Sequence, residues 1–166
     1  MKRDHRPTGL ARRMLLAGSM LLAGCGGAEP RPDVQEQIAL LQAGSEDERY
    51  EALASLQTLG PDGGEAVGDL RTLLKAAKDD DLAAEIAKTL GTMGPAAAAA
   101  VPELTALLGR KAMWPRYAAV EALGRLGPAA APALPAILKL TKDPDRDVAA
   151  AAQETARRLS RKRKTK

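Results

Sequence analysis

The sequence has few of the residues on which aromatic cores, disulfide frameworks and histidine chemistry depend. Its 166 residues include no phenylalanine, one tryptophan, two tyrosines, one histidine and one cysteine. A single cysteine excludes a disulfide within the chain. Scarce aromatic residues disfavour a β-sandwich or barrel, whereas abundant alanine and leucine favour helices that approach one another closely.

The N-terminal region is organised like a secretory signal. A basic stretch at residues 1–13 precedes an apolar run at residues 14–24, which Cys25 follows. Eleven residues in a helix rise only about 16 Å, whereas a hydrocarbon core is about 30 Å thick, so a transmembrane helix is not expected here. We therefore expect residues 1–24 to be a signal peptide that directs export.

The end of this apolar run resembles the lipobox of bacterial lipoproteins. In that family a leucine and two small residues precede a cysteine that is lipidated, and the signal is cleaved just before it. The matching residues are Leu22, Ala23, Gly24 and Cys25. The resemblance implies a lipid anchor at Cys25, a linker at residues 25–32 and a place on the periplasmic side of the bacterial envelope, or at the outer membrane where two membranes are present. The alternative is a stray or buried cysteine after an ordinary signal.

Charge is divided unevenly along the chain, although the net charge is only +4. Residues 25–156 carry 13 basic and 20 acidic side chains. The final ten residues carry no acidic side chain and seven basic ones, Arg157, Arg158, Arg161, Lys162, Arg163, Lys164 and Lys166. In an exported protein such a tail favours anionic lipid or an envelope polyanion as a partner and makes nucleic acid an unlikely one. The alternative is a frayed, solubilising end with no partner.

From residue 33 onward the sequence repeats itself. The segments RYEALASLQTLGP, AAEIAKTLGTMGP and RYAAVEALGRLGP begin at Arg49, Ala83 and Arg116, and a degraded fourth copy begins at Ala149. The spacings are 34, 33 and 33 residues. Each of the first three copies ends in a Gly-Pro pair, and a second apolar stretch follows it.

Apolar residues in both halves of each repeat follow helical spacing. The first half has offsets of 0, 4 and 7, as at Ala52, Leu56 and Leu59, and the second half has offsets of 0, 3 and 6. Pro102 and Pro135 share a column in the second half, and we expect them to mark helix starts because proline is tolerated in a first turn.

Each repeat is thus a helical hairpin that needs its neighbours to cover its apolar stripe. This pattern predicts an all-α fold, a short α-solenoid of about eight helices. We expect the repeat domain to span residues 33–160, with a capping helix at residues 33–43, a closing helix at residues 145–160 and a basic tail at residues 161–166.

The segment AVEALGRLGP at residues 119–128 resembles HEAT repeats, in particular the short type named after phycobilisome lyases. The turn DPDRDVAAAA from Asp143 is similar to the aspartate-rich turn of that family. The resemblance covers residues 46–159 and is specific to the repeat class rather than to a function. Tetratricopeptide and ankyrin motifs are absent from the sequence.

HEAT repeats often carry an arginine early in the first helix, which pairs with turn aspartates of an adjacent repeat. Arg49 and Arg116 occupy this position, whereas Ala83 and Ala149 interrupt the column. The resemblance therefore implies a partial ladder between repeats. We expect the aspartates at residues 79–81 and 143–147 to cap helices and to pair with this ladder. Calcium binding is the alternative, which the lack of a loop glycine and a distal glutamate disfavours.

Little catalytic chemistry is available to the mature chain. His5 lies in the expected signal, and the thiol of Cys25 is expected to be lipidated. We therefore expect no metal site, no cofactor and no enzyme activity. An accessory chromophore lyase is the least favoured function that the resemblance suggests.

Two sets of residues are candidates for binding. The face formed by the second helices is expected to bind another protein, as extended solenoid faces do. The candidates on that face are Asp69, Arg71, Lys75, Glu103 and Lys139. A solvated helix face is the alternative for these residues. Trp114 and Tyr117 are expected to pack in the core at a repeat junction, although an exposed pair would be a binding anchor.

These features together predict a non-enzymatic protein-binding scaffold or adaptor that is anchored to the bacterial envelope. The alternative is a membrane- or polyanion-binding module that acts through the basic tail.

Overall fold

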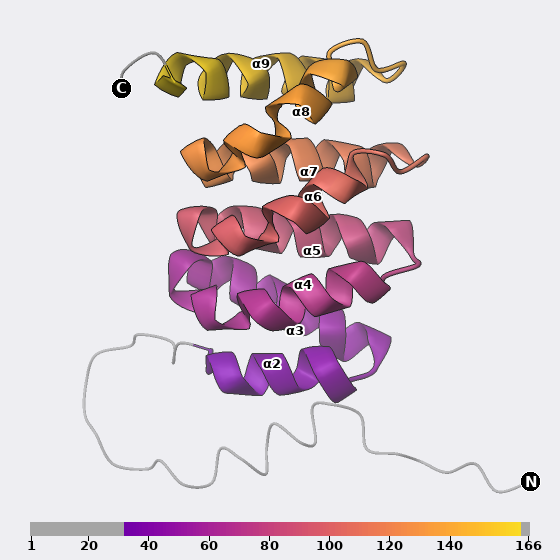
Figure 1. Ribbon diagram of the computed structural model, residues 1–166. Helices are drawn as coiled ribbons and strands as arrows, with labels where there is room; N and C mark the ends of the chain where they lie inside the picture. The colour runs from indigo at the N-terminus through magenta and orange to yellow at the C-terminus, as the bar shows by residue number, and fades with distance from the viewer. Residues whose placement is uncertain (1–31, 164–166) are drawn as a thin grey trace, which may run out of the picture. The chain divides into compact units, whose positions relative to one another are not determined.

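A computed structural model describes residues 32–163 as a stack of helical hairpins (Figure 1). Within this range lie eight α-helices, three short 3₁₀ helices and no strand. The stack starts with α2 (Val34–Ala43) and ends with α9 (Arg146–Arg163). The three hairpins between them pair α3 (Glu46–Leu59) with α4 (Val67–Ala76), α5 (Asp80–Thr92) with α6 (Val101–Leu107), and α7 (Met113–Leu126) with α8 (Leu134–Leu140). The predicted all-α solenoid is confirmed.

The hairpins form two layers of helices. Figure 1 shows α4, α6 and α8 in the near layer, with α3, α5, α7 and α9 behind them. The core lies between the layers and is made of the apolar columns of the repeats: Ala52, Leu56, Ile86, Leu90, Ala119 and Leu123 are fully buried. Many of these side chains are small, so the two layers approach closely.

Polar side chains cap the starts of α3, α5 and α9. Ser45 and Glu48 form a reciprocal capping box at the start of α3. Asp79 accepts a hydrogen bond from the Leu82 amide at 2.8 Å, and Asp145 accepts one from the Val148 amide at 3.2 Å. These aspartates satisfy amides that have no partner within the helix.

Each hairpin turns through a seven-residue 3₁₀ helix that the repeat pattern did not predict. The three are η2 (Gly60–Ala66), η3 (Gly94–Ala100) and η4 (Gly127–Ala133). The first residue of each is a glycine, with φ values of 54, 57 and 66° that residues with a side chain rarely adopt. A proline follows each of these glycines. Pro102 and Pro135 are the second residues of α6 and α8, so these prolines mark helix starts as expected.

The closing helix is longer than predicted. α9 continues to Arg163 rather than ending near Ser160, so the first residues of the expected tail are helical. Leu159 is buried near this end and arginines occupy the last turns, where cations favour the helix dipole. No helix over residues 32–163 is both long and apolar enough to cross a membrane.

Several expected features lie outside the described residues. These are the signal peptide, the lipobox residues Leu22, Ala23, Gly24 and Cys25, the linker up to residue 31, and Lys164 and Lys166 of the tail. The side chains of Lys162 and Arg163 are likewise not described.

Candidate binding groove

The face predicted to bind a partner carries an ion-pair cluster within the protein. Arg71 on α4 donates hydrogen bonds to both carboxylate oxygens of Glu103 on α6, at 3.1 and 3.0 Å. The Nζ of Lys75 lies 3.0 Å from the same carboxylate. The Glu103 side chain is 5% exposed, so its charge is satisfied inside the molecule.

The electrostatics of this cluster follow from its geometry. The hydrogen bond from Arg71, supported by a second one from Lys75, lowers the pKa of Glu103 to about 2 despite burial, which opposes the shift. The same hydrogen bond to Glu103 raises the pKa of Arg71. The cluster therefore joins α4 to α6 as a structural contact between repeats.

The other two predicted face residues lie apart from this cluster. Asp69 accepts a hydrogen bond at 2.6 Å from Gln42 on α2. Lys139 is exposed on α8, beside Leu138. The structure therefore brings together Arg71, Lys75 and Glu103 but does not gather all five candidates into one site.

Arg116 makes the kind of contact that a ladder between repeats requires. Its Nε and Nη2 donate to the two carboxylate oxygens of Asp143 at 2.9 and 2.8 Å, and its Nη1 donates to three loop carbonyls. The hydrogen bond from Arg116 lowers the pKa of Asp143. Both side chains are buried, with exposures of 11% and 3%.

Arg49 lacks such a partner at its Nε atom, which is buried without a hydrogen bond. Asp143 stands two residues before the capping Asp145, whereas Ala77 stands at the same place before the capping Asp79. The carboxylate that would match Arg49 is therefore missing from the sequence of this turn.

Arg110 provides a contact between repeats that the sequence analysis missed. Its Nη1 donates to Asp80 at 2.8 Å, and its Nη2 donates to the carbonyl of Ala77 at 2.6 Å. Arg110 lies in a loop, outside the repeated columns. The available signal was the run of aspartates at residues 79–81, about one repeat earlier.

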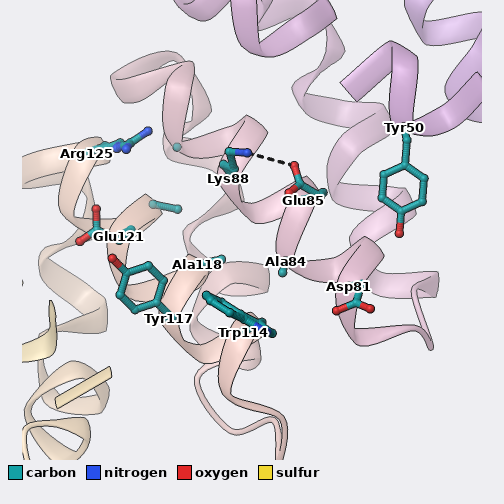
Figure 2. A pocket seen from close by; sticks show the side chains of 12 residues that line it. Tyr50, Asp81, Ala84, Glu85, Lys88, Trp114, Tyr117, Ala118, Glu121 and Arg125 are labelled. Atoms are coloured by element: carbon teal, nitrogen blue, oxygen red, sulfur yellow. Dashed lines mark hydrogen bonds and ion pairs between the residues drawn. The ribbon is translucent and has the colours of Figure 1, made fainter. Parts of the chain in front are cut away.

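A groove of about 660 Å³ lies on the layer formed by the first helices (Figure 2). The three aromatic side chains of the sequence, Tyr50, Trp114 and Tyr117, all line it. Trp114 and Tyr117 meet edge to face, with ring centroids 6.3 Å apart and planes at 89°. Tyr50 approaches from α3, on the other side of α5.

The expectation that Trp114 packs in the core is wrong, because its side chain is 59% exposed. In an α-helix, five residues correspond to a rotation of about 140° beyond one full turn, so Trp114 lies well away from the apolar stripe that contains Ala119. The buried residues of α7 begin instead at Pro115 and Arg116.

The groove exists because the second repeat lacks a large side chain. Tyr50 and Tyr117 occupy the same position in the first and third repeats, where the second repeat has Ala84. Near the other end of the groove, a Cβ added to Gly91 would lie 3.0 Å from the Cα of Ala122. Small residues thus form the floor of the groove, and long side chains stand at its edges.

The two ends of the groove carry different charged side chains. Asp81 lies near Tyr50, whereas Arg125 lies at the opposite side in Figure 2. Burial and the negative charges of Asp79, Glu46, Asp81 and Glu85 raise the pKa of Tyr50. Glu85 is engaged by Lys88 at 3.4 Å and by Gln57 at 3.1 Å. The end near Tyr50 is therefore acidic and aromatic.

A second, basic pocket of about 410 Å³ lies between the C-terminal parts of α7 and α9. Arg125, Arg158 and Arg161 line it, so the structure places two arginines of the expected tail beside one from α7. A Cβ added to Gly124 would overlap the guanidinium of Arg158, which shows how closely α9 lies against α7 here.

The sequence model of HEAT repeats matches residues 70–157, more than half of the chain. The chain belongs to the HEAT repeat family. No curated protein matches it. Over residues 32–163, this HEAT-repeat chain has no group of three or more histidine, cysteine, aspartate or glutamate residues that could hold a metal ion.

Similarity to a solved structure supports this fold. An engineered protein from the Northeast Structural Genomics Consortium is similar with a TM-score of 0.63 and 21% identity, over 77% of this HEAT-repeat chain and 62% of its own. The chain thus spans 62% of the length of that protein. The complex of CpcE and CpcF of phycocyanin lyase from Nostoc sp. is similar with a TM-score of 0.41 and 23% identity, over 86% of this chain and 70% of its own.

Proposed function

We propose that this HEAT-repeat protein is a non-catalytic scaffold that holds a segment of a partner protein in the groove between α5 and α7. One observation carries the proposal: the three aromatic side chains of the sequence meet at one exposed groove. Aromatic anchors seated in pockets supply much of the energy of protein interfaces. A tryptophan with 59% of its surface exposed contributes little to the core, which favours a role at the surface.

The chemistry of the groove favours binding over catalysis. Its lining supplies alanine, glycine, aromatic rings, carboxylates and two cations, without a histidine, cysteine or serine. Glu85 is engaged by Lys88 at 3.4 Å and by Gln57 at 3.1 Å. A nucleophile activated by a histidine is therefore absent from this lining.

A position-specific crosslinking experiment tests the proposal. A photo-reactive residue is placed at Glu121 in the groove, with a matched control at Leu138, which is 51% exposed on α8. In the native host we expect one defined protein adduct from position 121, none from position 138, and loss of the adduct when Trp114→Ala is added. Equal adducts from both positions, or none from position 121, would overturn the proposal.

The proposed scaffold is anchored to the bacterial envelope through Cys25. The match of residues 22–25 to a lipobox, after a basic and an apolar segment, supports this part of the proposal. Two or three acyl chains would hold the protein firmly, whereas one chain binds membranes only marginally. Intact mass measurement of protein from the native host should show loss of residues 1–24 and an acylated cysteine. An unmodified thiol, or a retained signal, would contradict the anchor.

A second candidate function is the binding of anionic membranes through the C-terminal end. The basic pocket lined by Arg125, Arg158 and Arg161 favours this candidate, because each basic residue near an anionic surface contributes about 1 kcal/mol. Sedimentation with phosphatidylglycerol vesicles tests it on a Cys25→Ser variant that cannot be acylated. We expect salt-sensitive binding that is lost when residues 160–166 are deleted. Vesicle binding that persists both in this deletion and in an Arg125→Ala, Arg158→Ala double variant would exclude this function.

A further inference from the structure

We infer that the acidic, aromatic end of the groove recognises a lysine or arginine side chain on the bound segment of the partner protein. The inference rests on the proposed function and adds the chemistry of the partner. The cationic group would lie among Tyr50, Trp114 and Tyr117, beside the carboxylate of Asp81.

The aromatic geometry suits a cation. Because the planes of Trp114 and Tyr117 are perpendicular, the two rings form a corner rather than a closed stack, and Trp114 keeps much of its surface open. Figure 2 shows Tyr50 across from this corner, on the far side of Ala84. Ring faces carry partial negative charge and attract ammonium and guanidinium groups.

The charges around this end also favour a cation. Asp81 is exposed and lines the groove. Burial and the negative charges of four carboxylates raise the pKa of the Tyr50 hydroxyl. Of the two cations that line the groove, Lys88 lies beside Glu85, and Arg125 stands eleven residues beyond Trp114, about 16 Å along α7. An arriving lysine or arginine would therefore meet ring faces and the carboxylate of Asp81, while Lys88 is held by Glu85 one helical turn beyond Ala84.

A second copy of this chain could present the same chemistry through its basic tail. Arg158 and Arg161 of that tail already lie against α7 in a pocket of their own, and Leu159 is buried. We therefore assign the cation to a different protein, and the experiment includes an arm that separates the two sources.

The sole tryptophan makes the test direct, because Trp114 lines the groove and its fluorescence reports occupancy. The probes are an acetylated, amidated hexa-arginine peptide and its hexa-citrulline analogue, which keeps the shape and removes the charge. We expect a saturable change in fluorescence with hexa-arginine and at least about tenfold weaker binding of hexa-citrulline.

Two matched variants test whether the carboxylate of Asp81 contributes to the affinity for hexa-arginine. Asp81→Asn should weaken hexa-arginine binding by about three- to tenfold. Asp147→Asn removes the same charge from the first turn of another helix, α9, and should change the affinity by less than about twofold. Trp114→Leu should abolish binding of hexa-arginine, which calorimetry measures because this variant has no tryptophan fluorescence. The substitution should leave the fold intact because the side chain is exposed.

Three results would overturn the inference. Equal binding of the two peptides would mean that the groove takes a segment without regard to charge, and equal effects of Asp81→Asn and Asp147→Asn would mean nonspecific attraction. The full chain could also self-associate. If this self-association is abolished both by Trp114→Leu and by deletion of residues 161–166, the cation belongs to a second copy of the chain. In each case, a crosslinked adduct between position 121 and a different protein would leave the proposed scaffold function standing. If no such adduct forms in the protein that retains Trp114, the scaffold function itself is wrong.

Discussion

The two layers of the solenoid expose different surfaces. On the layer of α4, α6 and α8, Arg71 and Lys75 converge on Glu103 and satisfy it within the protein. On the layer of α3, α5 and α7, the exposed ring of Trp114, the half-buried rings of Tyr50 and Tyr117 and the carboxylate of Asp81 surround a groove with a floor of small residues. Charged residues on a helix face are therefore a poor marker of a binding site when neighbouring repeats can pair them.

The spacing of the residues explains this difference. In a stack of repeats, residues separated by about one period lie on neighbouring helices of the same layer. Arg71 and Glu103 are 32 residues apart, as are Gln57 and Thr89, and each pair is joined by a hydrogen bond. Opposite charges at this spacing therefore indicate contacts between repeats. The aromatic residues have no such complement one repeat away, because Ala84 stands between Tyr50 and Tyr117.

The largest loss of stability is expected where internal pairing is most complete, at Arg116 and Asp143. Asp143→Ala leaves the buried guanidinium of Arg116 without its carboxylate and should lower the free energy of unfolding by roughly 3 kcal/mol. Urea denaturation measures this change. Asp147→Ala, an exposed aspartate in the next turn, should cost no more than about 1 kcal/mol. Equal losses for the two variants would show that the pair adds nothing beyond capping.

A smaller effect is expected at Glu103. Glu103→Gln weakens the contacts with Arg71 and Lys75 and should lower the free energy of unfolding at pH 7 by roughly 1–3 kcal/mol. Because the pKa of Glu103 is lowered from 4.5 to about 2, the unfolded state binds more protons between these values. The stabilisation is thus fully present above about pH 5 and is lost as the pH falls from 4.5 toward 2. Unfolding of both proteins, measured from pH 7 to pH 2, should show the difference shrinking, and a constant difference would contradict the assigned pKa.

Filling the groove should change binding more than stability. Ala84→Tyr restores the tyrosine that the first and third repeats carry, and its ring would occupy the space between Tyr50 and Tyr117. We expect the free energy of unfolding to change by less than about 1 kcal/mol, while hexa-arginine binding falls by at least about tenfold. Denaturation and calorimetry on the same protein measure both quantities. Retained affinity would place the binding site elsewhere.

The smallest change in stability is expected at Trp114. Trp114→Ala removes a side chain that is 59% exposed, so the free energy of unfolding should change by about 0.5 kcal/mol or less. Partner crosslinking from position 121 should nevertheless disappear. A large loss of stability would assign Trp114 to packing and would remove the contrast between the two layers.

Local patterns in the sequence sufficed to predict most of the fold. The offsets of apolar residues predicted the helices and their buried stripes, Asp79 and Asp145 cap helices as expected, and Pro102 and Pro135 lie at helix starts. These features depend on a few neighbouring residues, so they can be recognised without knowledge of the stack. The 3₁₀ helices and the extension of α9 to Arg163 were not predicted, because the repeat pattern does not specify how a turn is wound or where packing stops.

The sequence by itself determined the period, the helices and the sets of residues that repeat. The tertiary structure alone decided that Arg110, which lies outside the repeated columns, contacts Asp80 of the preceding repeat. It also decided that Trp114 faces outward and that the small residue Ala84 opens a groove. The physical reason is that helix formation depends on local spacing, whereas ion pairs and grooves depend on which side chains of successive repeats face one another.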